Sequence, residues 1–257
     1  MNWSALDWGI LGPALLAGLL VLATHVPLGM QVLDRGIVFI DLAIAQIAGL
    51  GVIAADAVGL PAGGAAVQAA AVSAALLGAW LLTWTERRAP QDQEALIGVM
   101  FILAACAGIV LLASNPHGGE HLKDLLVGQI LWVNSAQLLW LGAVSAVLLL
   151  AMWLGWVQRL GRFGFYGVFA IAVTASVQLV GVYLVFSSLI IPALATIALP
   201  RGARRNALAY GIGALGYALG LALSALLDLP SGAVIVWTLA ACALAAAALF
   251  RPAPGQA

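Results

Sequence analysis

The chain has 257 residues, of which 64% are hydrophobic and only 8% are charged, and its mean hydropathy is +1.11. Soluble domains carry roughly a quarter charged residues, so this composition excludes a water-soluble domain. The formal net charge is zero, which excludes the basic surface that a nucleic-acid partner requires. The composition therefore predicts an all-α polytopic membrane protein, with residues 1–257 forming a single transmembrane domain in contact with membrane lipid.

Charged and turn residues divide the chain into apolar windows, and a spanning helix needs about 20 such residues. Nine windows are found, at 9–33, 36–55, 62–84, 95–114, 136–157, 164–180, 182–199, 206–227 and 233–250. The boundary at Gly181 leaves an alternative of eight spans, in which 164–199 forms one long kinked helix. The apolar run within 117–132 is too short to cross, so it predicts an interfacial or re-entrant helix.

The basic residues indicate the orientation. Nine of the ten fall after windows one, three, five, seven and nine, at Arg35, Arg87, Arg88, Arg159, Arg162, Arg201, Arg204, Arg205 and Arg251. Basic residues are enriched in cytoplasmic loops. We therefore expect a multi-pass protein of the bacterial inner membrane with its N-terminus outside and its C-terminus in the cytoplasm.

Small residues recur four positions apart, as at Gly216 and Gly220. Such pairs lie on one side of a helix and let a second backbone approach closely, which is how helices pack in lipid. The spacing therefore predicts a close helix–helix contact at this position.

The single lysine excludes an ATP-binding motif of the P-loop kind. Lys123 follows Leu122, whereas a P-loop requires glycine before its lysine. The chain is therefore expected not to be an enzyme, and any process driven by ATP must draw its energy from another subunit.

Ionisable and polar groups at membrane depth are candidates for function. Asp41 lies about five residues inside the second window, and Gln46 follows on a different side of the helix, roughly 140° away. Asp41 either caps the helix or pairs with Arg35, or it contacts a transported species. His25, in the first window, is either a hydrogen-bonded structural histidine or a residue of the path.

The run HGGEH at 117–121 brings two imidazoles and a carboxylate together on the predicted outer side. These groups suit Zn²⁺ or Mn²⁺. His117, Glu120 and His121 therefore form either an ordinary polar loop or a transient metal contact at an entrance. No stably bound cofactor is expected, and a divalent metal ion would be the transported substrate.

Five blocks in the same order resemble the permease subunits of the zinc, manganese and iron ABC importers. They are HVPLGMQVLDRGIVFIDLAIAQIAGLG (25–51), EALIGVMFILAACAGIVLLAS (94–114), LKDLLVGQILWV (122–133), VQLVGVYLVFSSLIIPALATIAL (177–199) and LSALLDLPSGAVIVW (223–237). Two features depart from the family pattern. Gln46 stands at the family's histidine position with Asp41 displaced by one from the aspartate position, and only QRLGRFGF (158–165) remains of the cytoplasmic segment after span five.

The resemblance implies a homodimeric permease that works with a separate ABC ATPase subunit and a periplasmic metal-binding protein. It implies metal contacts at Asp41 and Gln46. We expect the short cytoplasmic turns to dock the ATPase through Arg159, Arg162, Arg201, Arg204 and Arg205. The alternatives are a metal carrier without an ATPase and an intramembrane hydrolase that pairs Ser176 or Ser187 with His25.

Overall fold

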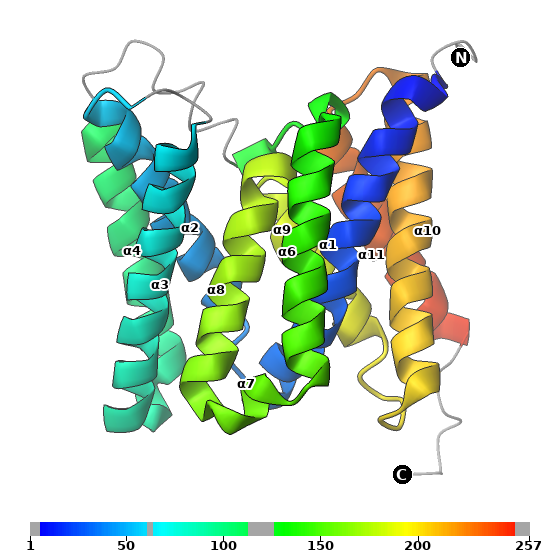
Figure 1. Ribbon diagram of the computed structural model, residues 1–257. Helices are drawn as coiled ribbons and strands as arrows, with labels where there is room; N and C mark the ends of the chain where they lie inside the picture. Colours follow the sequence, from blue (N-terminus) through cyan, green and yellow to red (C-terminus); the bar gives the residue numbers. More distant parts are fainter. Residues whose placement is uncertain (1–5, 61–63, 113–125, 250–257) are drawn as a thin grey trace.

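The computed structural model describes residues 6–60, 64–112 and 126–249, and all of its regular elements there are helical. The helices are α1 Trp8–Arg35, α2 Ile40–Ala57, α3 Ala65–Arg88, η2 Pro90–Asp92, α4 Gln93–Leu112, η3 Ile130–Trp132, α6 Ser135–Trp153, α7 Trp156–Arg159, α8 Gly161–Val180, α9 Val182–Ala195, α10 Ala203–Leu227 and α11 Ser231–Leu249 (Figure 1). Within the described ranges, eight of them are long and apolar enough to cross a membrane. The predicted all-α polytopic architecture is confirmed.

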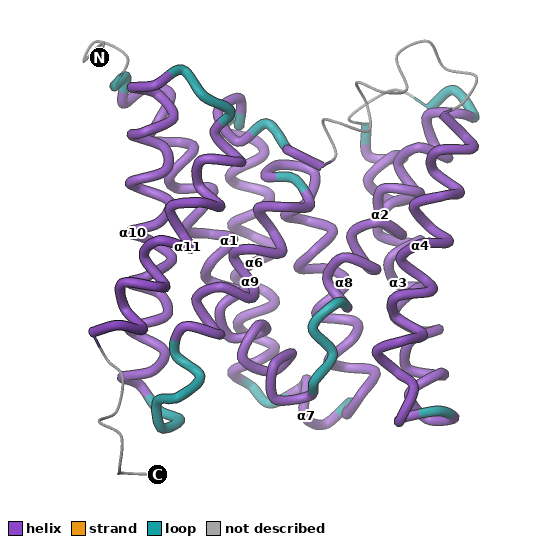
Figure 2. Tube along the Cα trace, turned by 180° about the vertical axis from the view of Figure 1, so that it is seen from behind, coloured by secondary structure: helices purple, strands orange, loops and turns teal. Residues whose placement is uncertain are grey.

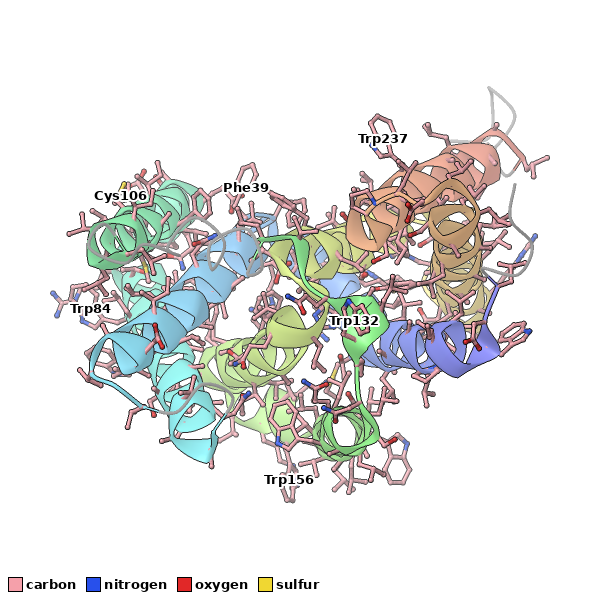
Figure 3. All side chains as sticks on the ribbon, turned by 90° about the horizontal axis from the view of Figure 1, so that it is seen from above. Phe39, Trp84, Cys106, Trp132, Trp156 and Trp237 are labelled. Atoms are coloured by element: carbon pink, nitrogen blue, oxygen red, sulfur yellow. The ribbon has the colours of Figure 1, made fainter. Side chains whose placement is uncertain are left out.

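The helices form two groups that meet along α8. Helices α2, α3 and α4 pack together on one side, and α1, α9, α10 and α11 pack together on the other (Figure 2). Most of the apolar window of α8 is buried, 72%, whereas 17% of that of α6 is buried. Seen from above, the labelled Trp156 and Trp237 point outward from the bundle (Figure 3). The outer helices therefore present apolar surface suited to lipid, while α8 belongs to the protein core.

Small residues set the closest helix contacts. A Cβ atom added at Gly216 would lie 2.6 Å from Leu239 Cδ2, and one added at Gly220 would lie 2.6 Å from Ile235 Cα. The predicted close contact at this glycine pair is confirmed, and α11 is the helix that makes it. Helices α1 and α9 also make a close contact, in which Gly29 of α1 packs directly against the Leu189 carbonyl of α9.

The chain reverses direction at Gly181 between α8 and α9. Gly181 has φ +81° and ψ 160°, a conformation that breaks the helix and favours glycine. Helix α8 starts beside α3, where Arg162 pairs with Glu86, and the residues after α9 return to that same end, where Arg201 pairs with Asp34. The eight-span alternative, a single kinked helix over 164–199, is therefore wrong. Helix α9 has 14 residues and so rises only about 21 Å.

The expected interfacial helix at 117–132 is not continuous where the structure describes it. Residues 113–125 lie outside the described ranges. From Leu126 onward, Gly128 adopts φ +71° and interrupts the helical run, and only the three-residue turn η3 follows. The fifth window also breaks, because Gly155 at φ +71° separates α6 from α7.

The two ends of the bundle differ in chemistry. At one end, Arg162 Nε lies 3.3 Å from Glu86 Oε1, Arg201 NH2 lies 3.1 Å from Asp34 Oδ2, and the Arg35 guanidinium lies 4.2 Å above the centre of the Phe165 ring. We call this the arginine end. Helix α2 begins there, so its last turn, with Asp56, lies at the opposite end.

Candidate functional site

Asp41 is a buried carboxylate in the first turn of α2. It is 1% exposed, and neither of its side-chain oxygens accepts a hydrogen bond within the described part of the chain. Its only evident stabilisation is the positive end of the helix dipole. The Arg35 guanidinium stacks on Phe165, and no ion pair with Asp41 is found among the described residues. Because a buried charge without a partner is costly, Asp41 lies in a position suited to a cationic ligand.

Gln46 lies on another side of α2. It is partly buried and lines a narrow cavity of about 10 Å³ together with Gly108 of α4 and Val177 of α8. Asp41 does not line this cavity. The structure therefore keeps the two predicted metal contacts apart, as their spacing along the helix requires.

His25 is buried in the middle of α1. Its Nδ1 lies 2.9 Å from the Val21 carbonyl oxygen and 3.0 Å from Thr24 Oγ1, so this nitrogen is held by its own helix. Its Nε2 is buried without a partner in the described residues. Among the same residues, neither Ser176 nor Ser187 forms a hydrogen bond to His25. The hydrogen-bonded pair of serine and histidine that the hydrolase alternative requires is therefore not formed by these three residues.

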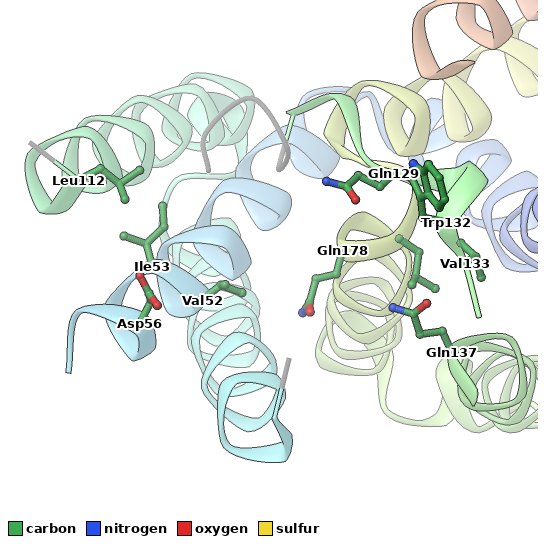
Figure 4. Close-up of a pocket in the computed structure, with 10 residues that line it drawn as sticks. Val52, Ile53, Asp56, Leu112, Gln129, Trp132, Val133, Gln137 and Gln178 are labelled. Atoms are coloured by element: carbon green, nitrogen blue, oxygen red, sulfur yellow. The ribbon is translucent and has the colours of Figure 1, made fainter. Parts of the chain in front are cut away.

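A larger cavity opens at the end opposite the arginines. Its volume is about 270 Å³, and its described lining is Val52, Ile53, Asp56, Leu112, Gln129, Trp132, Val133, Gln137, Gln178 and Leu179. Figure 4 shows Asp56 and Leu112 on the α2–α4 side and Gln129, Trp132 and Gln137 on the facing side, with Gln178 between them. We call this cavity the amide vestibule, after its three glutamines.

Hydrogen bonds hold two of these glutamines in place. Gln137 and Asn134 form a reciprocal cap on α6, in which each side-chain oxygen accepts from the other's backbone N–H at 2.9 Å. The Gln178 Oε1 accepts from Gln68 Nε2 at 2.6 Å, which ties α8 to α3. Gln137 is exposed, so its side-chain nitrogen remains for a ligand, whereas the Gln178 Nε2 is buried and has no partner among the described residues.

Two glycines fix the backbone next to the vestibule residues Gln129 and Leu179. Gly128 and Gly181 pack backbone against backbone, and a Cβ atom on either would collide with the main chain of the other segment. Next to them, the Gln129 N–H donates to the Leu179 carbonyl at 3.2 Å. The irregular segment before η3 is thereby joined to the elbow between α8 and α9.

The remaining predicted site residues lie at the two ends. His117, Glu120 and His121 fall outside the described residues, although Leu112, five positions before His117, lines the vestibule. At the arginine end, Arg159, Arg162, Arg201 and Arg204 are exposed. Arg205 is only 4% exposed, so it is turned into the protein rather than toward a partner.

The vestibule could not be recognised from the sequence, because its polar residues come from four separated segments. A usable signal exists for two of its glutamines: Gln137 lies at the start of window 136–157 and Gln178 near the end of window 164–180, where a side chain reaches the membrane surface. No group of three or more histidine, cysteine, aspartate or glutamate residues that could hold a metal ion is found among the described residues.

Known proteins share both this sequence pattern and this fold. The profile of the family described as the ABC 3 transport family matches residues 7–160 and 155–250. Taken individually, no curated protein matches the chain.

Two solved structures are similar to this one. PsaBC from Streptococcus pneumoniae, solved in complex with a Fab, has a TM-score of 0.75 and 22% sequence identity, covering 95% of this chain and 92% of the other. An inward-facing transporter described as of the metal-chelate ABC type has a TM-score of 0.65 and 17% identity, covering 93% and 83%. At these identities the likeness concerns the fold.

Proposed function

The chain belongs to the ABC 3 transport family, and from this premise we propose that it is the membrane permease subunit of an importer for a divalent transition-metal ion. The family match spans nearly the whole helical bundle. The zinc, manganese and iron importers are the branch that the five sequence blocks resemble. The chain supplies the path through the membrane, and a separate ATPase supplies the energy.

Asp41 is the observation that carries this proposal. It is a fully buried carboxylate with two free oxygens on a helix that begins at the arginine end. A passing divalent ion serves as its transient partner. A site built on one carboxylate is weak for a transition metal, and weakness suits a conduit because the ion must leave again.

The arginine end is the docking surface for the ATPase in this proposal. Arg159, Arg162, Arg201 and Arg204 are exposed there on neighbouring turns. Guanidinium groups form bidentate pairs with carboxylates, which suits a protein partner. By the positive-inside rule this end faces the cytoplasm, so the vestibule faces the periplasm, where a metal-binding protein would deliver the ion.

The vestibule end is accordingly the entrance. Leu112 and Gln129 line the vestibule, and His117, Glu120 and His121 lie between these two residues in the sequence. These residues would capture the ion transiently before it enters. A second copy of the chain would complete the path as a homodimer.

Uptake by liposomes tests this proposal. The chain is reconstituted with the ATPase that copurifies with it, and uptake of Zn²⁺, Mn²⁺ and Fe²⁺ is measured with and without ATP on the ATPase side. The proposal predicts uptake that stops when ATP is omitted or when the ATPase Walker lysine is replaced. Equal uptake without ATP would instead identify a secondary carrier, and no uptake of any metal would contradict the proposal.

A further inference from the structure

We propose that the amide vestibule binds the metal ion through the ligand shell that the ion brings with it, so that no protein atom enters the coordination sphere there. The inference rests on the proposed function and concerns the form in which the cargo enters. That shell is either water, which presents O–H groups to the wall, or a small oxygen-rich chelator, which presents oxygen atoms, and an amide has both an acceptor and a donor for these groups.

The size of the vestibule fits an ion with its shell. Direct coordination places protein atoms about 2.0–2.6 Å from the metal, which requires a small site with converging ligands. Six waters occupy about 180 Å³ at roughly 30 Å³ each. The vestibule volume of about 270 Å³ accommodates such a shell, whereas a bare ion would contact one wall at most.

The chemistry of the wall also fits a shell. Among the described lining residues, Asp56 is the only charged one and histidine and cysteine are absent. A transition metal stripped of water needs such ligands in greater number. Neutral amides, by contrast, donate to and accept from bound water or chelator oxygens at little desolvation cost.

The Gln137 side chain is oriented for this contact. The Gln137 oxygen is fixed by the Asn134 backbone N–H, and the Gln178 oxygen is fixed by Gln68. Gln137 is exposed, so its nitrogen is left for the cavity, whereas the Gln178 Nε2 is buried and has no partner among the described residues. An N–H group cannot coordinate a cation, but it donates to a chelator oxygen, and an amide oxygen accepts from a water molecule in the shell.

The position of Asp41 completes the inference. Asp56 and Asp41 are fifteen residues apart on α2, or about 22 Å along the helix. After the entrance, the ion therefore passes through the hydrated, weakly charged vestibule before it reaches the buried Asp41 carboxylate. We infer that the shell is shed between these two points.

Charge substitutions in the vestibule test the proposal. Gln137→Glu keeps the oxygen that caps α6 and replaces the free nitrogen by a charged oxygen, whereas Asp56→Asn removes a charge. The matched control is Gln91→Glu, the same change at an exposed residue of η2, at the other end and outside the proposed docking residues. For each variant, KM and maximal rate of uptake are measured with MnCl₂, ZnCl₂ and manganese citrate.

A hydrated cation predicts that Gln137→Glu lowers KM about three- to tenfold and Asp56→Asn raises it by a similar factor. An anionic chelate predicts the reverse signs with manganese citrate. In either case the factor must be the same for Mn²⁺ and Zn²⁺ when their shells are the same, and Gln91→Glu must leave KM unchanged. Unchanged KM in both vestibule variants, or a shift that differs severalfold between the two metals, would overturn the proposal.

Equilibrium dialysis of Mn²⁺ against the purified chain separates this inference from the proposed function. The same variants must shift the Kd in the same directions without any ATPase. If uptake occurs but neither KM nor Kd responds to vestibule charge, the transport function stands and the vestibule proposal fails. If Kd responds but no uptake occurs, the vestibule proposal stands and the transport function fails.

Discussion

The two ends of the helix bundle use polar residues in opposite ways. At the arginine end, charged groups are exposed and pair with one another, as in Arg162 with Glu86 and Arg201 with Asp34. At the vestibule end, neutral glutamines line a cavity and Asp56 is the one charged group in its described wall. Exposed arginines suit a lasting contact with another protein, whereas neutral amides suit a small cargo that must move on.

The difference shows that charge alone does not mark a functional surface in a membrane protein. Among the described residues, the largest gathering of charge lies away from the cavity, and two of the cavity's glutamines already have a hydrogen bond to protein on one side. The interior carries its own exception in Asp41, a buried carboxylate in the first turn of α2, near the arginine end.

The vestibule end and the arginine end should face opposite sides of the membrane, and labelling from outside the cell should therefore differ most between them. A cysteine introduced as Asp56→Cys should react with a membrane-impermeant maleimide in intact cells, and one introduced as Arg204→Cys should react only after the membrane is opened. Labelling of the native chain under the same conditions provides the background. Labelling of both positions from the same side would contradict the predicted orientation of the two ends.

Arg204→Glu should abolish assembly with the ATPase while the permease still inserts in the membrane. Reversing an exposed charge repels the carboxylates that an arginine would pair with, and the exposed side chain contributes little to folding. Copurification of the ATPase measures assembly. The control is Asp56→Lys, a charge reversal at the other end, which should leave the complex intact; a normal complex with Arg204→Glu would disprove the docking surface.

Gly181→Ala should destabilise the protein by about 2 kcal/mol or more, because alanine at φ +81° is strained and its Cβ collides with the Gly128 segment. Gly211→Ala in α10 is the matched control, since a Cβ there meets nothing within 4 Å. Thermal unfolding in detergent measures both. Equal stability of the two variants would show that the close contact between Gly181 and the Gly128 segment does not stabilise the fold.

Arg201→Ala should have the smallest effect, about 0.5 kcal/mol or less on stability. The Arg201 and Asp34 side chains are 79% and 40% exposed, and such surface pairs contribute little. The same unfolding experiment detects the change. A loss as large as that from Gly181→Ala would mean that the arginine end holds the fold together as well as docking a partner.

The sequence predicted the fold well because each window of about 20 apolar residues can satisfy its backbone only as a helix. The reversal at Gly181 was anticipated as one of two alternatives, and glycine at a positive φ decided it. The interfacial or re-entrant helix was predicted because the apolar run within 117–132 is too short to cross the membrane, but in the described part Gly128, at φ +71°, interrupts the helical run and packs against the α8–α9 elbow.

The site was less predictable. Asp41 was identified because a lone carboxylate inside an apolar window is visible in the sequence. The vestibule was not, because Asp56, Gln129 and Gln178 meet only through the packing of α2 against α8. The arginine cluster was read as uniform, whereas Arg205 is buried, a difference that depends on how α10 packs.

The most direct measurement is ATP-driven metal uptake by Asp41→Asn in liposomes, compared with Gln46→Ala and with the native chain. Asparagine has the shape of aspartate and lacks its charge, so the account predicts that Asp41→Asn lowers uptake at least tenfold, that Gln46→Ala lowers it much less, and that both proteins accumulate normally in the membrane. Normal uptake by Asp41→Asn, with Asp41→Leu failing to accumulate, would show that Asp41 supports the fold and that the ion takes another path.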